Sequence, residues 1–269
     1  MRIGLIAGGG QFPLIFSKAA RAKGLEVFAV AHVNETDPAL ESHVTAMAWV
    51  HLGQLKRIIR FFSQHGIHDA VMMGGITKTR MFTDVRPDIK AIALIAGMRH
   101  TLDDGILSAF AGALEKEGIC IRASTFMLPE LLAPEGCWTR RKPTRDERAD
   151  IELGWRLAKE VGRLDIGQCL VVGGGSVLAV EAIDGTDATI ERGGRLGSGT
   201  AVVVKVCKPN QDFRFDVPAI GVETIRTMDR AGVRVLAIEA QKAVVFDRPE
   251  MIALANDRDI SIVAMATPE

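Results

Sequence analysis

The sequence lacks the features that mark secreted, zinc-binding, membrane-spanning and nucleic-acid-binding proteins. Its four cysteines form no C-x-x-C pair, and its six histidines show no H-E-x-x-H or other zinc-binding spacing. The longest apolar run after the N-terminus, residues 91–98, is far shorter than the ~20 residues needed to span a bilayer. Basic and acidic residues balance at 33 each, so no bulk charge attracts nucleic acid. These absences predict a cytoplasmic protein with reduced thiols and no nucleic-acid partner.

The first half of the chain alternates short apolar strands with amphipathic helices. A length of 269 residues predicts one large or two modest domains. The strand–helix alternation is typical of a parallel sheet with helices on both faces, so we predict a Rossmann-like N-terminal domain over residues 1–133. The expected strands are 2–7, 25–31 and 70–73, and the expected helices include 13–23 and 52–66.

The second half mixes a hairpin with further strand–helix alternation. Residues 134–148 are rich in proline and charge, which predicts a linker. The Gly-Gly-Gly-Ser run within residues 169–182 predicts two strands joined by a tight turn. A loop over residues 184–194 and a strand over 201–207 are expected next. We therefore predict a separate mixed α/β C-terminal catalytic domain over 149–269.

A glycine turn follows the first strand. Gly8, Gly9 and Gly10 stand where backbone N–H groups could approach a phosphate at a helix N-terminus, although a plain strand–helix turn has the same composition. The dinucleotide-binding fingerprint requires glycine where this chain has Pro13. Gly74 ends another strand at the same sheet edge. Nucleotide or phosphate contact and a purely structural turn both remain open.

Carboxylates stand at the expected starts of two helices. Asp104 precedes a helix, where it acts either as a cap or dipole partner or as a carboxylate aimed at a ligand or metal. Thr186 and Asp187 follow the hairpin, where they cap the next helix or provide an oxygen ligand for Mg²⁺.

The stretch KPNQDFRFDVPAIG, residues 208–221, concentrates charge directly after an apolar run. Phenylalanines alternate with Asp212, Arg214 and Asp216, which predicts an extended segment with the three charges on one face. That pattern favours a metal or anion site over an exposed loop of paired charges. Asp212 or Asp216 would hold metal or water, and Lys208 and Arg214 would hold phosphate.

These motifs together carry a family resemblance over essentially the whole chain. The stretches 162–190 and 208–221, with LIAGGGQFP and DDGIL in the same order and spacing, resemble the LpxI-type UDP-2,3-diacylglucosamine pyrophosphatases. The resemblance implies hydrolysis of UDP-2,3-diacylglucosamine to UMP and 2,3-diacylglucosamine 1-phosphate (lipid X) in lipid A biosynthesis. The resemblance further implies that water attacks the α-phosphorus and that the reaction requires a divalent metal, Mg²⁺ or alternatively Mn²⁺. It also implies a peripheral position at the inner-membrane surface, and a homodimer is a further expectation.

The resemblance also implies roles for individual residues. The R-x-D-x-P-x-I-G motif places the catalytic carboxylate at Asp216, as metal ligand or general base, with Asp212 as the preceding acidic position. Asp187 of the G-T-D motif is the second expected metal ligand. The expected substrate-binding residues are Gly8, Gly9, Gly10, Gly74, Asp104, Thr186, Lys208, Gln211 and Arg214.

Two other functions fit parts of the sequence. A Rossmann-type NAD(P) enzyme is disfavoured by Pro13 and by the lack of an acidic residue closing the second strand. A non-catalytic nucleotide- or lipid-binding module is disfavoured by the clustered carboxylates, because they repel an anionic diphosphate unless a metal intervenes.

Overall fold

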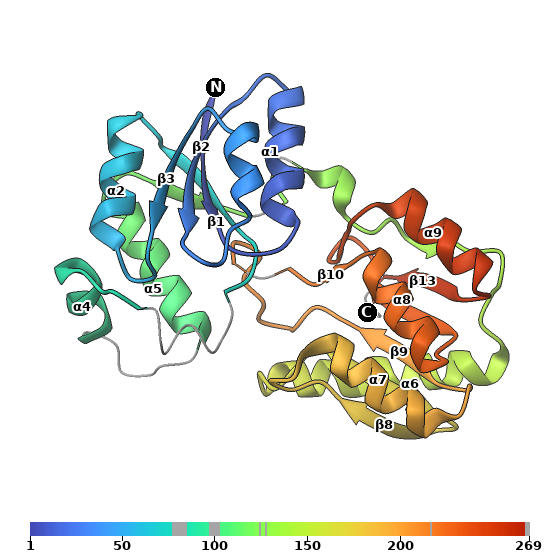
Figure 1. Ribbon diagram of the computed structural model, residues 1–269. Helices are drawn as coiled ribbons and strands as arrows, with labels where there is room; N and C mark the ends of the chain where they lie inside the picture. Colours follow the sequence, from blue (N-terminus) through green and yellow to red (C-terminus); the bar gives the residue numbers. More distant parts are fainter. Residues whose placement is uncertain (77–84, 97–102, 124, 127, 216, 267–269) are drawn as a thin grey trace. The chain divides into compact units, whose positions relative to one another are not determined.

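The protein is described here by a computed structural model (Figure 1). It describes residues 1–269 except 77–84, 97–102, 124, 127, 216 and 267–269, together with the side chains of 95–96 and 103–106. The chain divides into two compact units. The first comprises Met1–Leu128 and Asp212–Asp216, and the second comprises Pro129–Gln211 and Val217–Glu269.

The first unit is built on a five-stranded parallel sheet in the order β3-β2-β1-β4-β5. Because all strands are parallel, their carboxyl ends share one edge. This confirms the predicted Rossmann-like sheet, although the sequence reading passed over β3, whose first four residues are only half-buried. The strands are β1 (Arg2–Ala7), β2 (Glu26–His32), β3 (Ala46–Val50), β4 (Asp69–Met73) and β5 (Cys120–Arg122).

Helices cover both faces of this sheet (Figure 1). α1 (Phe12–Ala22) packs on one face through Phe16 and Ala20, which are fully buried. α2 (Leu55–Gln64), α4 (Ile89–Ala96) and α5 (Asp103–Glu115) form a core on the other face with Phe28 and Ala70. A 3₁₀ helix, η1 (Pro38–His43), follows β2. The unit is therefore doubly wound, as the alternation of elements predicts.

The second unit holds a six-stranded mixed sheet in the order β6-β13-β11-β9-β7-β8. β9, β11 and β13 are parallel, whereas β6 and β7 run antiparallel to their neighbours, which confirms the predicted mixed α/β architecture. The strands are β6 (Gly136–Cys137), β7 (Cys169–Gly173), β8 (Ser176–Val180), β9 (Val202–Lys205), β11 (Val235–Glu239) and β13 (Ser261–Met265). A separate parallel pair joins β10 (Ala219–Ile220) to β12 (Val244–Val245).

The two faces of the second sheet carry different helices (Figure 1). α6 (Arg145–Arg163) packs on one face through Ile151, Trp155 and Ala158. The core on the other face takes in α7 (Gly185–Gly197), α8 (Val222–Ala231) and α9 (Arg248–Asp257). A short 3₁₀ helix, η2 (Pro129–Leu131), opens the unit. Within the described part of the chain, no helix has both the length and the apolarity to cross a membrane.

Two local predictions for the second half were wrong. The predicted linker, residues 134–148, carries β6 and the first residues of α6. That helix begins at a capping box in which the Thr144 hydroxyl accepts from the Glu147 N–H and the Glu147 carboxylate accepts from the Thr144 N–H. Residues 184–194, predicted as a loop, begin at the turn before α7 and continue into the helix. The glycines that suggested a loop serve helix packing, because Gly193 lies against Val171.

The predicted glycine hairpin is confirmed, and a buried carboxylate anchors it. Gly174 and Gly175 both have positive φ (58° and 75°), as a tight two-residue turn requires. Their N–H groups donate to the Asp150 carboxylate at 3.0 and 2.7 Å. Asp150 thereby ties α6 to the β7–β8 turn with two charge-assisted hydrogen bonds.

Gly193→Ala tests the close packing of α7 on β7. A Cβ at this position would lie 2.4 Å from Val171 Cβ, so overpacking should lower the free energy of unfolding by about 1–3 kcal/mol. Gly112→Ala in α5 is the control, because its Cβ would meet no atom within 4 Å and helix propensity alone should raise stability by about 0.5–1 kcal/mol. Urea denaturation followed by circular dichroism measures both. Equal stabilisation by the two alanines would contradict the packing.

Candidate functional site

The glycine turn after β1 is locked against the end of β4. The Gly8 N–H donates to the Met73 carbonyl at 2.7 Å, and the Gly9 N–H donates to the Gly75 carbonyl at 2.8 Å. A Cβ on Gly74 would lie 2.3 Å from the Gly9 carbonyl oxygen. These glycines are therefore required for close backbone packing, and two of the N–H groups expected to meet a phosphate already have acceptors. A phosphate contact by this turn would fall to Gly10 and the first turn of α1.

A buried histidine supports the same edge. His32, at the end of β2, is 8% exposed, and its Nδ1 lies 2.9 Å from the Ala7 carbonyl. Burial lowers the pKa of His32, so the ring is neutral near pH 7 and Nδ1–H donates to that carbonyl. The Thr36 hydroxyl donates to the same oxygen at 2.7 Å. Nothing in the sequence pattern indicated these contacts.

Residues 212–215 form a turn, so the predicted extended segment is wrong. The Phe215 N–H donates to the Asp212 carbonyl at 3.0 Å. Arg214 donates to the Asp212 carboxylate from Nε at 3.0 Å, from Nη2 at 2.7 Å and from its backbone N–H at 3.0 Å. Arg214 also holds the pKa of Asp212 below its usual range. Local hydrogen bonds of this kind outcompete an extended backbone.

This turn belongs to the first unit. Arg214 Nη1 pairs with Glu115 at 3.1 Å, and the guanidinium lies 4.9 Å from the centroid of the Phe215 ring. Phe215 packs on the first unit's core. Glu115 is the last residue of α5. Asp212 and Arg214 therefore form an ion-paired turn that is held against the end of α5.

Two predicted residues lie wholly or partly outside the described residues. Asp216, the predicted catalytic carboxylate, is itself outside them. Asp104 is the second residue of α5, and its side chain is outside them.

Buried charges gather at one edge of the second sheet. Lys205 is the last residue of β9, Glu239 is the last residue of β11, and Glu181 directly follows β8. They are 8%, 0% and 7% exposed. β8 and β9 are both antiparallel to β7, so all three strands end at the same edge. Burying a charge is costly unless it is paired, so each of these groups requires compensation.

Lys205 and the start of α7 form the part of this edge that carries predicted site residues. Lys205 Nζ donates to the Ala219 carbonyl of β10 at 2.9 Å. The Asp187 side chain is solvent-exposed, yet partial desolvation raises the pKa of its carboxyl, and the positive charge of Lys205 opposes that rise. Thr186 donates to Glu181 at 2.6 Å, so its hydroxyl is already engaged.

Glu181 and Cys169 complete the surroundings of Lys205. The other carboxylate oxygen of Glu181 accepts from the Gln168 N–H at 2.9 Å. The buried thiol of Cys169 has a strongly raised pKa because burial disfavours the thiolate, so it stays protonated. Lys205 is therefore a buried positive charge with acidic neighbours at this end of β9.

Glu239 anchors the chain that leaves β9. Its carboxylate accepts from Lys159 Nζ at 2.6 Å, from the Cys207 N–H at 2.9 Å and from Lys242 Nζ at 2.9 Å. Lys159 also donates to the Cys207 carbonyl at 2.8 Å. A fully buried carboxylate thus receives two ammonium groups and a backbone N–H, and the start of the 208–221 stretch is fixed.

Two predicted substrate-binding residues lie directly after this anchor. Lys208 pairs with Asp165 at 2.6 Å. The Gln211 side-chain oxygen accepts from the Lys208 N–H at 2.8 Å and closes a turn over residues 208–211. Both side chains therefore have roles in the turn, and an exchange of partners would be needed for Lys208 to bind phosphate.

The residues present fit a magnesium ion only in part. No group of three or more His, Cys, Asp or Glu side chains with metal-binding geometry occurs among the described residues. Mg²⁺ retains several waters and often takes only one or two protein carboxylates, so Asp187 with one further oxygen ligand would satisfy it.

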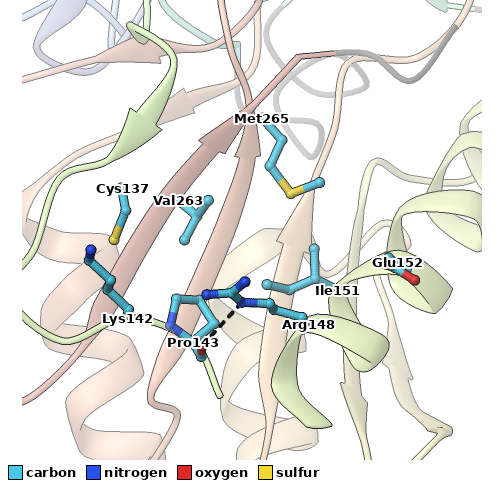
Figure 2. Close-up of a pocket in the computed structure, with 8 residues that line it drawn as sticks. All are labelled: Cys137, Lys142, Pro143, Arg148, Ile151, Glu152, Val263 and Met265. Carbon is cyan, nitrogen blue, oxygen red and sulfur yellow. Dashed lines mark hydrogen bonds between the residues drawn. The ribbon is translucent and has the colours of Figure 1, made fainter. Parts of the chain in front are cut away.

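A separate cavity of about 260 Å³ lies in the second unit, beside α6 and β13 (Figure 2). It contains none of the predicted site residues. Its lining residues are Cys137, Lys142, Pro143, Arg148, Ile151, Glu152, Val263 and Met265.

The structure thus groups the predicted residues in an unexpected way. Thr186 and Asp187 join Lys205 and Glu181 in the second unit, whereas Asp212 and Arg214 bind each other in the first. The sequence analysis gave no role to Lys205, Glu181 or Glu239. The sequence shows each of them as a charged residue at or just after the end of a strand, but it does not show that they are buried.

Comparisons with known proteins cover the whole chain. The family model described as the LpxI N-terminal domain matches residues 2–131, and that of the LpxI C-terminal domain matches residues 134–263. The UDP-2,3-diacylglucosamine pyrophosphatase LpxI of Caulobacter vibrioides is 34% identical over 281 residues, covering 100% of this chain and 99% of that protein.

Similarity to solved structures is slight. The biotin carboxylase domain of a single-chain bacterial carboxylase is 13% identical, with a TM-score of 0.27 over 65% of this chain and 31% of that one. A glycinamide-RNase-transformylase T from Mycobacterium tuberculosis is 17% identical, with a TM-score of 0.25 over 68% and 44%. At these scores the likeness supports no conclusion on fold or function.

Glu239→Gln tests the anchor. The substitution keeps the shape but removes the charge that compensates Lys159, so the free energy of unfolding should fall by about 3–5 kcal/mol. Glu223→Gln is the control, because its pair with Arg226 is exposed and its loss should cost less than about 1 kcal/mol. Urea denaturation measures both. A Glu239→Gln effect no larger than the control would contradict the anchoring role.

Proposed function

The chain belongs to the LpxI family, and on this premise we propose that it hydrolyses UDP-2,3-diacylglucosamine to UMP and 2,3-diacylglucosamine 1-phosphate in lipid A biosynthesis. The observation that carries the proposal is the match of both family domains along a chain that also aligns end to end with a pyrophosphatase of that name. Water attacks the α-phosphorus of the diphosphate.

In this proposal Asp216 is the catalytic carboxylate, as metal ligand or general base. The support for this role is the R-x-D-x-P-x-I-G motif that contains it. In the second unit, Ala219 of the same motif accepts a hydrogen bond from the buried Lys205 at 2.9 Å.

The proposed metal is Mg²⁺, with Mn²⁺ able to replace it. Asp187 is the described carboxylate that fits, because it is exposed and lies at the edge that holds Lys205. Asp216 would provide the second oxygen. When bound, the ion would neutralise diphosphate charge and orient water. The protein's own part is to present the carboxylates, and the positive charge of Lys205 opposes the rise in the pKa of Asp187 that desolvation causes.

The remaining predicted residues take supporting roles in this proposal. Gly10 and the start of α1 remain the part of the glycine turn able to approach the nucleotide. Arg214 and Asp212 shape the turn before Asp216. The two acyl chains of the substrate favour a peripheral position at the cytoplasmic face of the inner membrane, because such a lipid resides in the bilayer.

The two rival functions make different predictions. An NAD(P) enzyme would use the glycine-turn N–H groups for a pyrophosphate, whereas those of Gly8 and Gly9 are bonded to Met73 and Gly75. A binding module would retain UDP-sugar affinity but show no turnover with either Mg²⁺ or Mn²⁺.

Hydrolysis in ¹⁸O-labelled water tests the proposal. The purified protein with UDP-2,3-diacylglucosamine and Mg²⁺ should place the label in UMP, as seen by phosphorus NMR, and EDTA should abolish turnover. Asp216→Ala should lower kcat by roughly 10²–10⁴-fold, the range for loss of a general base. Asp229→Ala is the control, because Asp229 lies on the partly exposed side of α8, where it pairs with Arg234 and Arg258, and its loss should leave turnover unchanged.

Each other result has a definite meaning. Label in the sugar phosphate would contradict attack at the α-phosphorus. Full turnover by Asp216→Ala would contradict the role of that residue. No turnover by the unmodified protein with Mg²⁺ or Mn²⁺ would overturn the proposed function.

A further inference from the structure

We propose that Lys205 binds the substrate directly, through a hydrogen bond from its ammonium group to a phosphoryl oxygen of the diphosphate. This inference rests on the proposed function for the identity of the substrate. Lys205 was not among the predicted site residues, although two of them, Thr186 and Asp187, lie at the same edge of the second sheet.

The first support is the burial of an ammonium group with little compensation. Lys205 is 8% exposed, and its hydrogen bond within the described residues goes to one neutral acceptor, the Ala219 carbonyl. An ammonium has three N–H donors, so this contact leaves capacity for further acceptors. No carboxylate among the described residues lies within ion-pair distance of it. A bound anion would complete its coordination.

The second support is the contrast with Lys159 in the same unit. Lys159 Nζ donates to the buried carboxylate of Glu239 at 2.6 Å and to the Cys207 carbonyl at 2.8 Å. That is the environment of a structural lysine, with an opposite charge in direct contact. Among the described residues, the carboxylates near Lys205 lie beyond ion-pair distance, and that of Asp187 is exposed. The described contacts therefore compensate the charge of Lys159 but not that of Lys205.

The third support is the direction of the side chain. Along β9, Val202 and Val204 pack with α6, whereas Val203 packs with the core that includes α7 and α8. Because side chains alternate along a strand, Lys205 projects to the same side as Val203. α7 begins at Gly185 and α8 begins at Val222, and charge interaction between Asp187 and Glu223 indicates that these N-termini are near each other. Helix N-termini favour a nearby anion, which strengthens the site.

The chemistry fits a diphosphate. The carbonyl that Lys205 holds belongs to β10, three residues after Asp216. An ammonium there would neutralise phosphoryl charge, and it would stabilise negative charge that develops on the phosphoryl oxygens during water attack. Uridine and acyl groups carry no charge, so they gain nothing from Lys205.

Two neutral variants separate phosphate binding from a structural role. Lys205→Gln keeps an N–H donor for the Ala219 carbonyl but loses the charge, and Lys205→Met loses both. Isothermal titration calorimetry with UDP and with uridine, in the presence of Ca²⁺ or Mg²⁺, measures the effect. Both variants should weaken UDP binding by roughly 10–100-fold, the value of one charge-assisted hydrogen bond, and leave uridine binding unchanged.

Lys142→Met is the control, because it removes an exposed lysine charge of the same unit that lines the separate cavity beside α6. Its affinity for UDP should equal that of the unmodified protein. If Lys205 only anchors Ala219, Lys205→Gln will bind UDP as tightly as the unmodified protein, which overturns the inference. If Lys205→Met does not fold, the UDP affinity of Lys205→Gln relative to that of the unmodified protein still tests the inference.

The outcomes also separate this inference from the proposed function. UDP binding that depends on Lys205, without hydrolysis by the unmodified protein, would support the inference and overturn the proposed function. Hydrolysis by the unmodified protein, together with full UDP affinity in both neutral variants, would support the proposed function and overturn the inference. No UDP binding by the unmodified protein would overturn the inference.

Discussion

The ion pairing of buried Glu239 organises the second unit's candidate site. A carboxylate inside an apolar sheet is tolerated only with direct compensation, and Lys159, Lys242 and the Cys207 N–H provide it. Because Cys207 is bonded there, the chain leaving β9 starts from a fixed point. That contact also helps to fix Lys205, which lies two residues before Cys207. It likewise fixes the 208–211 turn, which follows Cys207 directly. Without it, the charged stretch would begin from a mobile strand end.

The charged stretch itself is divided between the two units. Residues 208–211 and the chain from Val217 onward belong to the second unit, whereas 212–216 belong to the first. The Asp212–Arg214–Glu115 contacts hold the middle, and Lys205 holds Ala219 beyond it. The charges in the described part of the motif therefore serve largely to fix its own backbone, before and after the proposed catalytic residue, Asp216. Charge density in a sequence motif does not by itself identify the groups that meet a ligand.

The sequence predicted the layers well and the site only in part. Strand–helix alternation follows from hydrophobic periodicity, so both sheets and the glycine hairpin were predictable. α7 was missed because its glycines suggested a loop, whereas Gly193 is required by contact with Val171. The 212–215 turn was missed because an alternating pattern of residue types does not reveal that Arg214 hydrogen-bonds to Asp212, two residues earlier. Lys205 was missed because burial, which makes it unusual, is a tertiary property.

The most direct test is a crystal structure of the protein with UDP and a divalent cation. If the buried edge of the second sheet binds the diphosphate, a phosphoryl oxygen will lie about 2.7–3.2 Å from Lys205 Nζ, the distance of a hydrogen bond. The metal should then lie beside Asp187. A diphosphate bound at the glycine turn, without contact to Lys205, would contradict this assignment. It would show that the phosphate-binding site lies in the first unit.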